Sequence, residues 1–163
     1  MIALGYGRGI ANKRRQLYPG SAGLATDLTQ LARVLIARRK FGEARAAMAE
    51  ALPIAQATLG PNSIPTLMLQ MQMVEVDAED GRVAEAQLLF DRLSRQVAAL
   101  PLPPQPVATL ARAEAILRLD QGRRTEARAA LNRAASIMGK LGPAGAAFIK
   151  GLAPIDKRIG EAI

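Results

Sequence analysis

The sequence predicts an all-α protein made of antiparallel helix pairs that repeat along the chain. Half of its 163 residues are hydrophobic but only 3% are aromatic. The core must therefore be packed from alanine, leucine, methionine and isoleucine, which favours helices over strands. Strand-length runs of alternating valine and isoleucine are absent. In addition, two sequence landmarks recur about every 42 residues, which is typical of a helical repeat protein.

The first landmark is a Glu-Ala pair that occurs in three segments aligning without gaps. The shared alanines are Ala44, Ala86 and Ala127. They lie 42 and 41 residues apart, and a glycine precedes the alanine by five residues in the second and third copies. Gly81 and Gly122 can adopt the left-handed conformation that ends a helix, whereas the first copy has Arg39 at this place. Each copy therefore predicts a hairpin turn between two helices.

The second landmark is a Leu-x-Pro turn that follows the same period. Its copies are Leu17-Tyr18-Pro19, Leu59-Gly60-Pro61 and Leu141-Gly142-Pro143. They are separated by 42 and 82 residues, and a proline-rich segment at 100–106 lies midway between the last two. A Gly-Pro pair stops one helix, and Ser63 or Asn62 can cap the next, with Pro65 tolerated in its first turn. We therefore interpret these turns as the joints between repeat units.

These landmarks divide one predicted domain, residues 1–163, into three helix pairs with an extra segment at each end. The units span 22–58, 63–99 and 106–140. Within them, the first helices are expected at 22–38, 63–79 and 106–120, and the second helices at 42–58, 83–99 and 124–140. Residues 1–17 take the place of a second helix from a preceding unit, and residues 143–163 are expected to form C-terminal capping helices.

The apolar pattern of each helix agrees with these boundaries. In the first helix, leucines recur at helical spacing on one face: Leu24, Leu28, Leu31 and Leu35. The second helices begin with the Glu-Ala pair, whose small alanine lets the two helices of a hairpin approach closely. Pro53 lies inside a predicted second helix and predicts a kink or an early stop. Three glycines predict a weak leading helix: Gly5, Gly7 and Gly9.

The chain has no cysteine and no histidine, which excludes several kinds of chemistry. Disulfides, thiolate catalysis, Cys/His metal sites and nucleophiles activated by an imidazole base all need these residues. The Gly-x-Gly-x-Gly run at 5–9 follows no predicted strand, so it does not indicate a dinucleotide site. We therefore expect no cofactor, no metal and no enzymatic activity. No apolar run approaches ~18 residues, and the N-terminus lacks the apolar segment of a secretory signal, so a cytoplasmic protein without membrane contact is expected.

Three sequence features carry a resemblance to a known family. They are the Leu31-Ala32 pair of the first helix, the Gly-x-x-x-Glu-Ala hairpins at 81–86 and 122–127, and the apolar stripe that follows each hairpin. With these features, residues 10–145 resemble the tetratricopeptide repeat family. The repeat length and the phrase EALPIAQATLGPNSIPTL are similar to the long-repeat, kinesin-light-chain-like subclass found in bacterial signalling proteins. The resemblance implies a TPR-like α-solenoid, a right-handed superhelical array of helix pairs, that serves as a protein–protein interaction scaffold.

In this family, the first helices line a concave groove that binds a partner peptide or protein. The repeat register then implies nine partner-binding residues: Thr26, Gln30, Arg33, Met68, Gln72, Glu75, Glu79, Thr109 and Asp120. The family's carboxylate clamp is not expected, because its lysine and asparagine positions hold Gln30, Ala37 and Met68. Arg33 and the acidic positions could recognise a polar peptide. Alternatively, Glu75 and Glu79, which are spaced i to i+4, form only a solvated face.

The net charge of +8 leaves two further interpretations open. Basic clusters occur at 13–15, 38–40 and 123–124, and the last two lie near helix ends where cations favour the helix dipole. A basic nucleic-acid-associated helical domain is one alternative, but the aromatic residues that stack on bases are missing, so nucleic acid is not the expected partner. The other is a self-associating oligomerisation module, with Met68, Met71 and Met73 exposed at an incomplete end.

Overall fold

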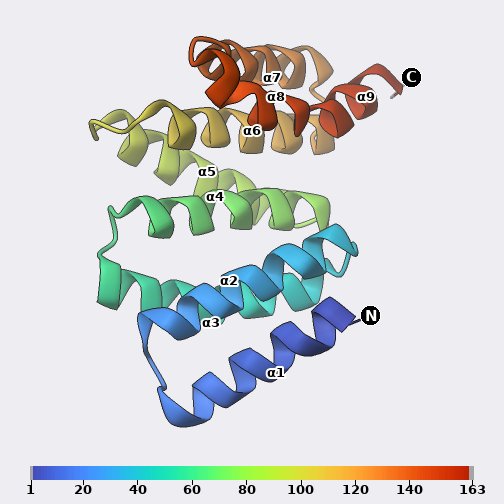
Figure 1. Cartoon of the computed structure of the whole chain (residues 1–163). Coiled ribbons are helices and arrows are strands. Elements are labelled where there is room, and N and C mark those ends of the chain that lie inside the picture. The colour runs from blue at the N-terminus through green and yellow to red at the C-terminus, as the bar shows by residue number, and fades with distance from the viewer. Residues whose placement is uncertain (1, 162–163) are drawn as a thin grey trace. The chain divides into compact units, whose positions relative to one another are not determined.

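The computed structural model describes residues 2–161, and within that range its regular elements are all helical (Figure 1). The helices are α1 Ile2–Leu17, α2 Ala22–Ala37, α3 Phe41–Leu59, α4 Ile64–Glu79, α5 Val83–Ala98, α6 Pro104–Asp120, α7 Arg124–Gly139, the short 3₁₀ helix η1 Gly142–Gly145, α8 Ala146–Lys150 and α9 Ala153–Glu161. The predicted all-α class of helix pairs is confirmed. Helices α2 to α7 begin and end within two residues of the six predicted ranges.

Residue contacts divide the chain into two compact units, one up to Val76 and one from Asp77 onward. Each unit is described by itself below. The organisation of residues 1–163 as one domain stays a prediction.

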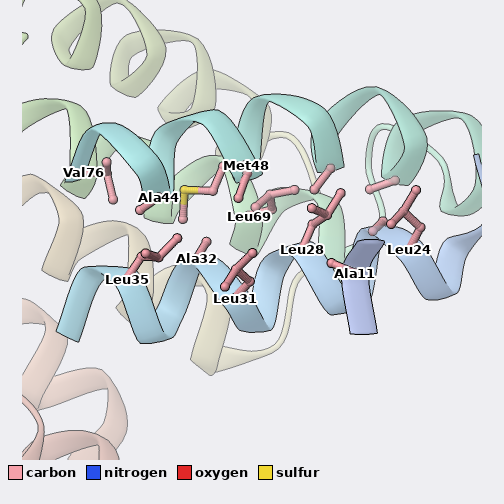
Figure 2. Close-up of a cluster of buried hydrophobic side chains, with 14 residues drawn as sticks. Ala11, Leu24, Leu28, Leu31, Ala32, Leu35, Ala44, Met48, Leu69 and Val76 are labelled. Atoms are coloured by element: carbon pink, nitrogen blue, oxygen red, sulfur yellow. The ribbon is translucent and has the colours of Figure 1, made fainter. Parts of the chain in front are cut away.

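The first unit is built around the α2–α3 hairpin. The leucines of α2 that lie at most 2% exposed are Leu24, Leu28 and Leu35. They pack against the small and flexible side chains of α3 that have no exposed surface, which are Ala44, Met48 and Ala51. Figure 2 shows these rows facing each other, with Ala11 of α1, Leu69 and Val76 also in the cluster. Because alanine and methionine fill the space beside leucine, the two helices can pack closely.

Each hairpin turn is closed by the same two backbone hydrogen bonds. In α2–α3, the Arg39 N–H donates to the Ile36 carbonyl at 2.8 Å, and the Lys40 N–H donates to the Leu35 carbonyl at 2.9 Å. This pair defines a Schellman motif, which places one residue in the left-handed conformation. The α4–α5 and α6–α7 hairpins form the same bonds, and their predicted glycines have φ of 78° and 74°.

The residue after each left-handed position is cationic and is the N-cap residue, directly before the second helix of the pair. It forms an ion pair with the glutamate three residues later, and the pairs are Lys40–Glu43 at 3.0 Å, Arg82–Glu85 at 2.9 Å and Arg123–Glu126 at 2.6 Å. A glutamate in the first turn also interacts favourably with the helix dipole. The basic residues near the hairpins therefore take part in a recurring helix start.

Serine side chains cap the N-termini of α2 and α4. The Leu24 N–H donates to Ser21 Oγ at 3.2 Å, and the Thr66 N–H donates to Ser63 Oγ at 3.4 Å. Both bonds satisfy an N–H group that has no partner inside its helix. The prediction of Ser63 as a cap is confirmed, and Gly60, with φ of 92°, follows the last residue of α3.

The prediction that Pro53 could stop its helix early is wrong, because α3 continues through it to Leu59. Proline lacks an N–H group, so the carbonyl of Ala49 has no partner four residues later. Both Pro53 and Ala49 are exposed. The carbonyl without a partner can therefore face solvent, and the helix tolerates the missing bond.

The leading segment forms a continuous helix, α1, despite its glycines. Ala11 is 1% exposed and belongs to the core of the first unit. Three ion pairs join α1 to its neighbours: Arg8–Glu43, Arg14–Asp27 and Arg15–Glu50. Tertiary contacts therefore support a helix that its own sequence favours only weakly.

In the second unit, α6 carries nine buried residues. Small or branched residues line its packed faces, and those without exposed surface are Ala108, Ala113, Ala115 and Leu117. The alanines of α7 that complete this core are Ala127, Ala130 and Ala134, all without exposed surface. One period after α6, where a further first helix would lie, the chain instead forms α8 and α9, separated at Gly151–Leu152.

Candidate functional site

A groove with a cavity volume of about 380 Å³ lies in the first unit. The wall from α2 is formed by Thr26, Thr29, Gln30 and Arg33. The wall from α4 is formed by Pro65, Met68, Leu69 and Gln72. In both helices these residues are spaced i, i+3, i+4 and i+7, so they share one face. The remaining lining residues are Ala25, Ala55 and Leu59.

Five of the nine predicted partner-binding residues lie together in this groove: Thr26, Gln30, Arg33, Met68 and Gln72. Helical spacing and the repeat period were enough to predict this grouping, because the inner faces of α2 and α4 occupy equivalent places in successive helix-pair repeats. Whether a partner binds them stays a prediction.

Arg33 is the one charged residue among those that line the groove. Its side chain is exposed, and within residues 2–161 it forms neither an ion pair nor a hydrogen bond. By contrast, Arg14 and Arg15 of α1 are paired with carboxylates. The guanidinium of Arg33 is therefore available for a carboxylate, which it can bind through two parallel hydrogen bonds.

The same groove is lined by residues with polar acceptor atoms. The Oε1 atom of Gln72 is buried without a hydrogen-bond partner. A buried acceptor left unsatisfied costs about 1–3 kcal/mol, so a donor supplied by a ligand would be favourable. The hydroxyls of Thr26 and Thr29 donate to the carbonyls of Ala22 and Ala25 at 3.0 and 2.8 Å. Their oxygens keep acceptor capacity, which suits the N–H groups of a peptide.

The other predicted site residues lie elsewhere. Glu75 is half-buried on α4 and is not among the residues that line the groove. Thr109 is 1% exposed, and its hydroxyl donates to the Gln105 carbonyl at 2.9 Å. Thr109 is therefore buried and bonded within its own helix, and its role as a contact residue stays a prediction.

Glu79 and Asp120 lie together in the second unit, where a residue of α9 holds both. Arg158 forms ion pairs with Glu79 through Nη1 and with Asp120 through Nη2, the latter at 3.2 Å. Arg158 is not among the predicted residues, because the predicted register ends with the third helix-pair repeat, α6–α7. Continuing the period would have found it, since residues 33, 75, 116 and 158 are separated by 42, 41 and 42 residues.

The three methionines of the self-association hypothesis differ in exposure. Met71 has no exposed surface, and Met73 is half-buried against the core of the first unit. Only Met68 lines the groove. The expected exposure is therefore wrong for Met71, whereas self-association of the protein stays a prediction.

The described residues offer neither a metal-binding cluster nor a membrane-spanning helix. Among residues 2–161, no three carboxylates come together in an arrangement that could hold a metal ion. Within the same range, no helix has both the length and the apolar character needed to cross a bilayer.

Comparison with known proteins agrees with the helix-pair architecture. Residues 25–64 match the sequence profile of the tetratricopeptide repeat family. The matched segment contains most of α2, all of α3 and the turn into α4, and therefore much of the groove. Repeats of this kind generally mediate protein–protein interaction and are not catalytic. No curated protein matches the chain.

Proposed function

We propose that the protein is a protein–protein interaction scaffold that binds a peptide segment of a partner in the groove of the first unit. The observation that carries this proposal is the unpaired guanidinium of Arg33 in a groove that Gln72, with its unsatisfied Oε1 atom, also lines. A carboxylate of the partner would bind Arg33, and a backbone N–H would donate to Gln72. An aliphatic side chain would cover Met68 and Leu59.

The wider context of the function is part of the same proposal. The repeat length and the phrase around the Gly60-Pro61 turn are similar to the long-repeat subclass, so we place the protein in this subclass and in bacterial signalling or regulation. A groove that takes a peptide needs no cofactor, so we assign none. We also propose a cytoplasmic location, which suits a chain without cysteine.

A displayed library of random peptides tests the groove directly. Selection on the full chain should enrich sequences with aspartate or glutamate close to an aliphatic residue. The double variant Arg33→Ala, Gln72→Ala should bind the selected peptides at least about tenfold more weakly, because hydrogen bonds to a charged group contribute ~1.5–3 kcal/mol. Arg92→Ala is the matched control, since Arg92 is an exposed arginine of α5 that does not line the groove.

Two results would contradict the proposal. One is a set of selected peptides with no enrichment of acidic residues. The other is unchanged affinity of the double variant, measured by fluorescence anisotropy, when circular dichroism shows that the variant keeps its helices.

A further inference from the structure

The strongest unassigned feature is the surface of the second unit on which α9 lies. Where the repeat period would place one long helix, the chain forms two short ones, α8 and α9. Pro154, the second residue of α9, lacks the N–H that would continue a helix from α8, and Gly151 lies at the break. A nine-residue helix is marginal in water, so α9 depends on the surface that holds it.

The apolar part of that surface receives one face of α9. Leu152, Ile155 and Ile159 are 4%, 7% and 4% exposed, and their spacing of three and four residues places them on the same side. Contacts join α9 to both α6 and α7. The seat for these side chains is therefore an apolar strip on the α6–α7 hairpin.

Charged groups of the surface fix the direction and register of α9. Glu79 and Asp120 bind Arg158. At the C-terminal end of α9, Arg124 donates to the Ile159 carbonyl from Nε at 3.2 Å and from Nη2 at 2.6 Å. Arg128 pairs with Asp156. Together these groups would recognise a helix that presents a carboxylate to Arg128, an arginine to Glu79 and Asp120, and a C-terminal carbonyl to Arg124.

The attachment of α9 is separable from that of α8. Phe148 of α8 lies under the guanidinium of Arg112, at 6.0 Å, a contact that involves no residue of α9. A cavity of about 310 Å³ borders the link between the two helices and is lined by Ile149, Leu152 and Ala153 together with residues of α7. Displacement of α9 would therefore open the chain at this link, where the solvent-facing cavity leaves room for the movement.

From these contacts we infer that the α6–α7 surface, with Glu79, is a receptor for an amphipathic helix of a partner protein, and that α9 fills it in cis. The partner helix carries the pattern of α9: isoleucine, acid, any residue, arginine, isoleucine. It binds by displacing α9. This site lies in the second unit and is independent of the groove proposed above, so failure of one leaves the other standing.

A peptide in trans tests the receptor. The probe is an end-blocked, fluorescently labelled peptide with the sequence of residues 151–161, GLAPIDKRIGE. The host is the full chain with Ile155→Asp and Ile159→Asp, which removes its own α9 from the seat. The peptide should bind this host at least tenfold more tightly than it binds the wild-type chain, whose seat is filled. The same peptide with Arg158→Ala should bind the host at least tenfold more weakly.

Equal affinity for host and wild type, or equal affinity of the two peptides, would overturn the inference. A charge-reversed pair gives a matched rescue: the host that also carries Glu79→Arg and Asp120→Arg, which reverses both partners of Arg158, should prefer a peptide with Arg158→Asp over the unchanged peptide. Preference for the unchanged peptide argues against recognition through Arg158 and overturns that assignment.

Hydrogen exchange of the wild-type chain keeps the inference testable if the two aspartates unfold the host. Backbone amides of α9 should exchange at least a hundredfold faster than those of α6 and α7, because α9 opens by itself. Equal protection in α9 and α7 would show that α9 is a permanent part of the core and would overturn displacement.

Discussion

Arg39 has the left-handed backbone that the hairpin turn needs, with φ of 56°. Within residues 2–161 it is the one non-glycine residue with positive φ. Its Cβ crowds the backbone in this conformation, which costs an L-residue other than glycine roughly 1–2 kcal/mol. The guanidinium lies 5.2 Å from the centre of the Phe41 ring, and this contact offsets part of the cost.

Substitution of Arg39 by glycine should stabilise the protein. We expect Arg39→Gly to raise the free energy of unfolding by about 0.5–1 kcal/mol, because relief of the strain exceeds the lost ring contact. Urea unfolding followed by circular dichroism measures the change. Arg38→Gly is the control: Arg38 has φ of −96°, so glycine relieves no strain there and should destabilise. A loss of stability in Arg39→Gly would contradict the interpretation.

Glu50 should make stability depend on acid pH. Arg15 binds this carboxylate through Nε and Nη2 at 2.6 and 2.7 Å, and the hydrogen bond, followed by the charge, lowers the pKa of Glu50 below its ordinary value of 4.5 despite partial burial. A lowered pKa means that the contribution is complete above the ordinary value and is lost as pH falls through the lower folded value.

The matched variant for this effect is Glu50→Gln. Wild type should lose more stability than the variant between about pH 6 and about pH 3, by up to ~1 kcal/mol, since exposed ion pairs contribute little. Urea unfolding at both pH values measures the difference. Identical losses in the two proteins would show that the Arg15–Glu50 pair does not stabilise the attachment of α1.

At the scale of the element, α3 is the helix whose sequence and structure disagree most. Pro53 lies within it and leaves the Ala49 carbonyl without a helical partner. We expect Pro53→Ala to stabilise the chain by about 1–2 kcal/mol, since an interior proline costs ~3 kcal/mol and its stiffening of the unfolded chain returns only a part. Thermal unfolding measures this gain.

Pro65→Ala is the control for that prediction. Pro65 is the second residue of α4, where the missing N–H has no helical partner to lose. Its replacement should leave stability unchanged or slightly lower. A comparable gain at both positions would indicate that the effect comes from general helix propensity and not from the interior bond of α3.

Much of the element pattern could be predicted from the sequence because short-range chemistry determines it. Glycines at 81 and 122, the serine cap at 63 and the leucine face of α2 depend on local conformation and helical spacing. The grouping of the five groove residues could be predicted for the same reason, since it depends on helical spacing and the repeat period. The pairing of Glu79 and Asp120 could not be predicted from the three repeats alone, because their partner Arg158 lies one period beyond the third repeat, on α9. The burial of Thr109 depends on tertiary packing, which the repeat register does not give.

At the scale of the whole molecule, the charge of +8 is less available than composition suggests. Cations of the basic clusters form ion pairs within the chain, including Arg14–Asp27, Arg15–Glu50, Lys40–Glu43 and Arg123–Glu126. A cation that is already paired with a carboxylate does not neutralise a phosphate, so it releases no counterions from a nucleic acid. These cations are therefore less available to a nucleic acid than their number suggests.

Nucleic-acid binding should accordingly be weak. We expect labelled single-stranded and double-stranded DNA and RNA to show no saturable binding at about 0.15 M salt, the physiological value, in fluorescence anisotropy. Binding at low salt should be sequence-independent. Tight binding with a steep decrease as salt rises would favour the basic nucleic-acid-associated alternative over the peptide scaffold.

The Schellman turns have a consequence for engineering. Their bonds join backbone atoms, so the geometry of each hairpin makes few demands on the side chains that face the groove. Residues 26, 30, 33, 68 and 72 can therefore be randomised together while the turns, caps and leucine rows stay unchanged. A library built on these five positions would vary recognition at little expense in foldability, which makes the first unit a scaffold for selecting new peptide binders.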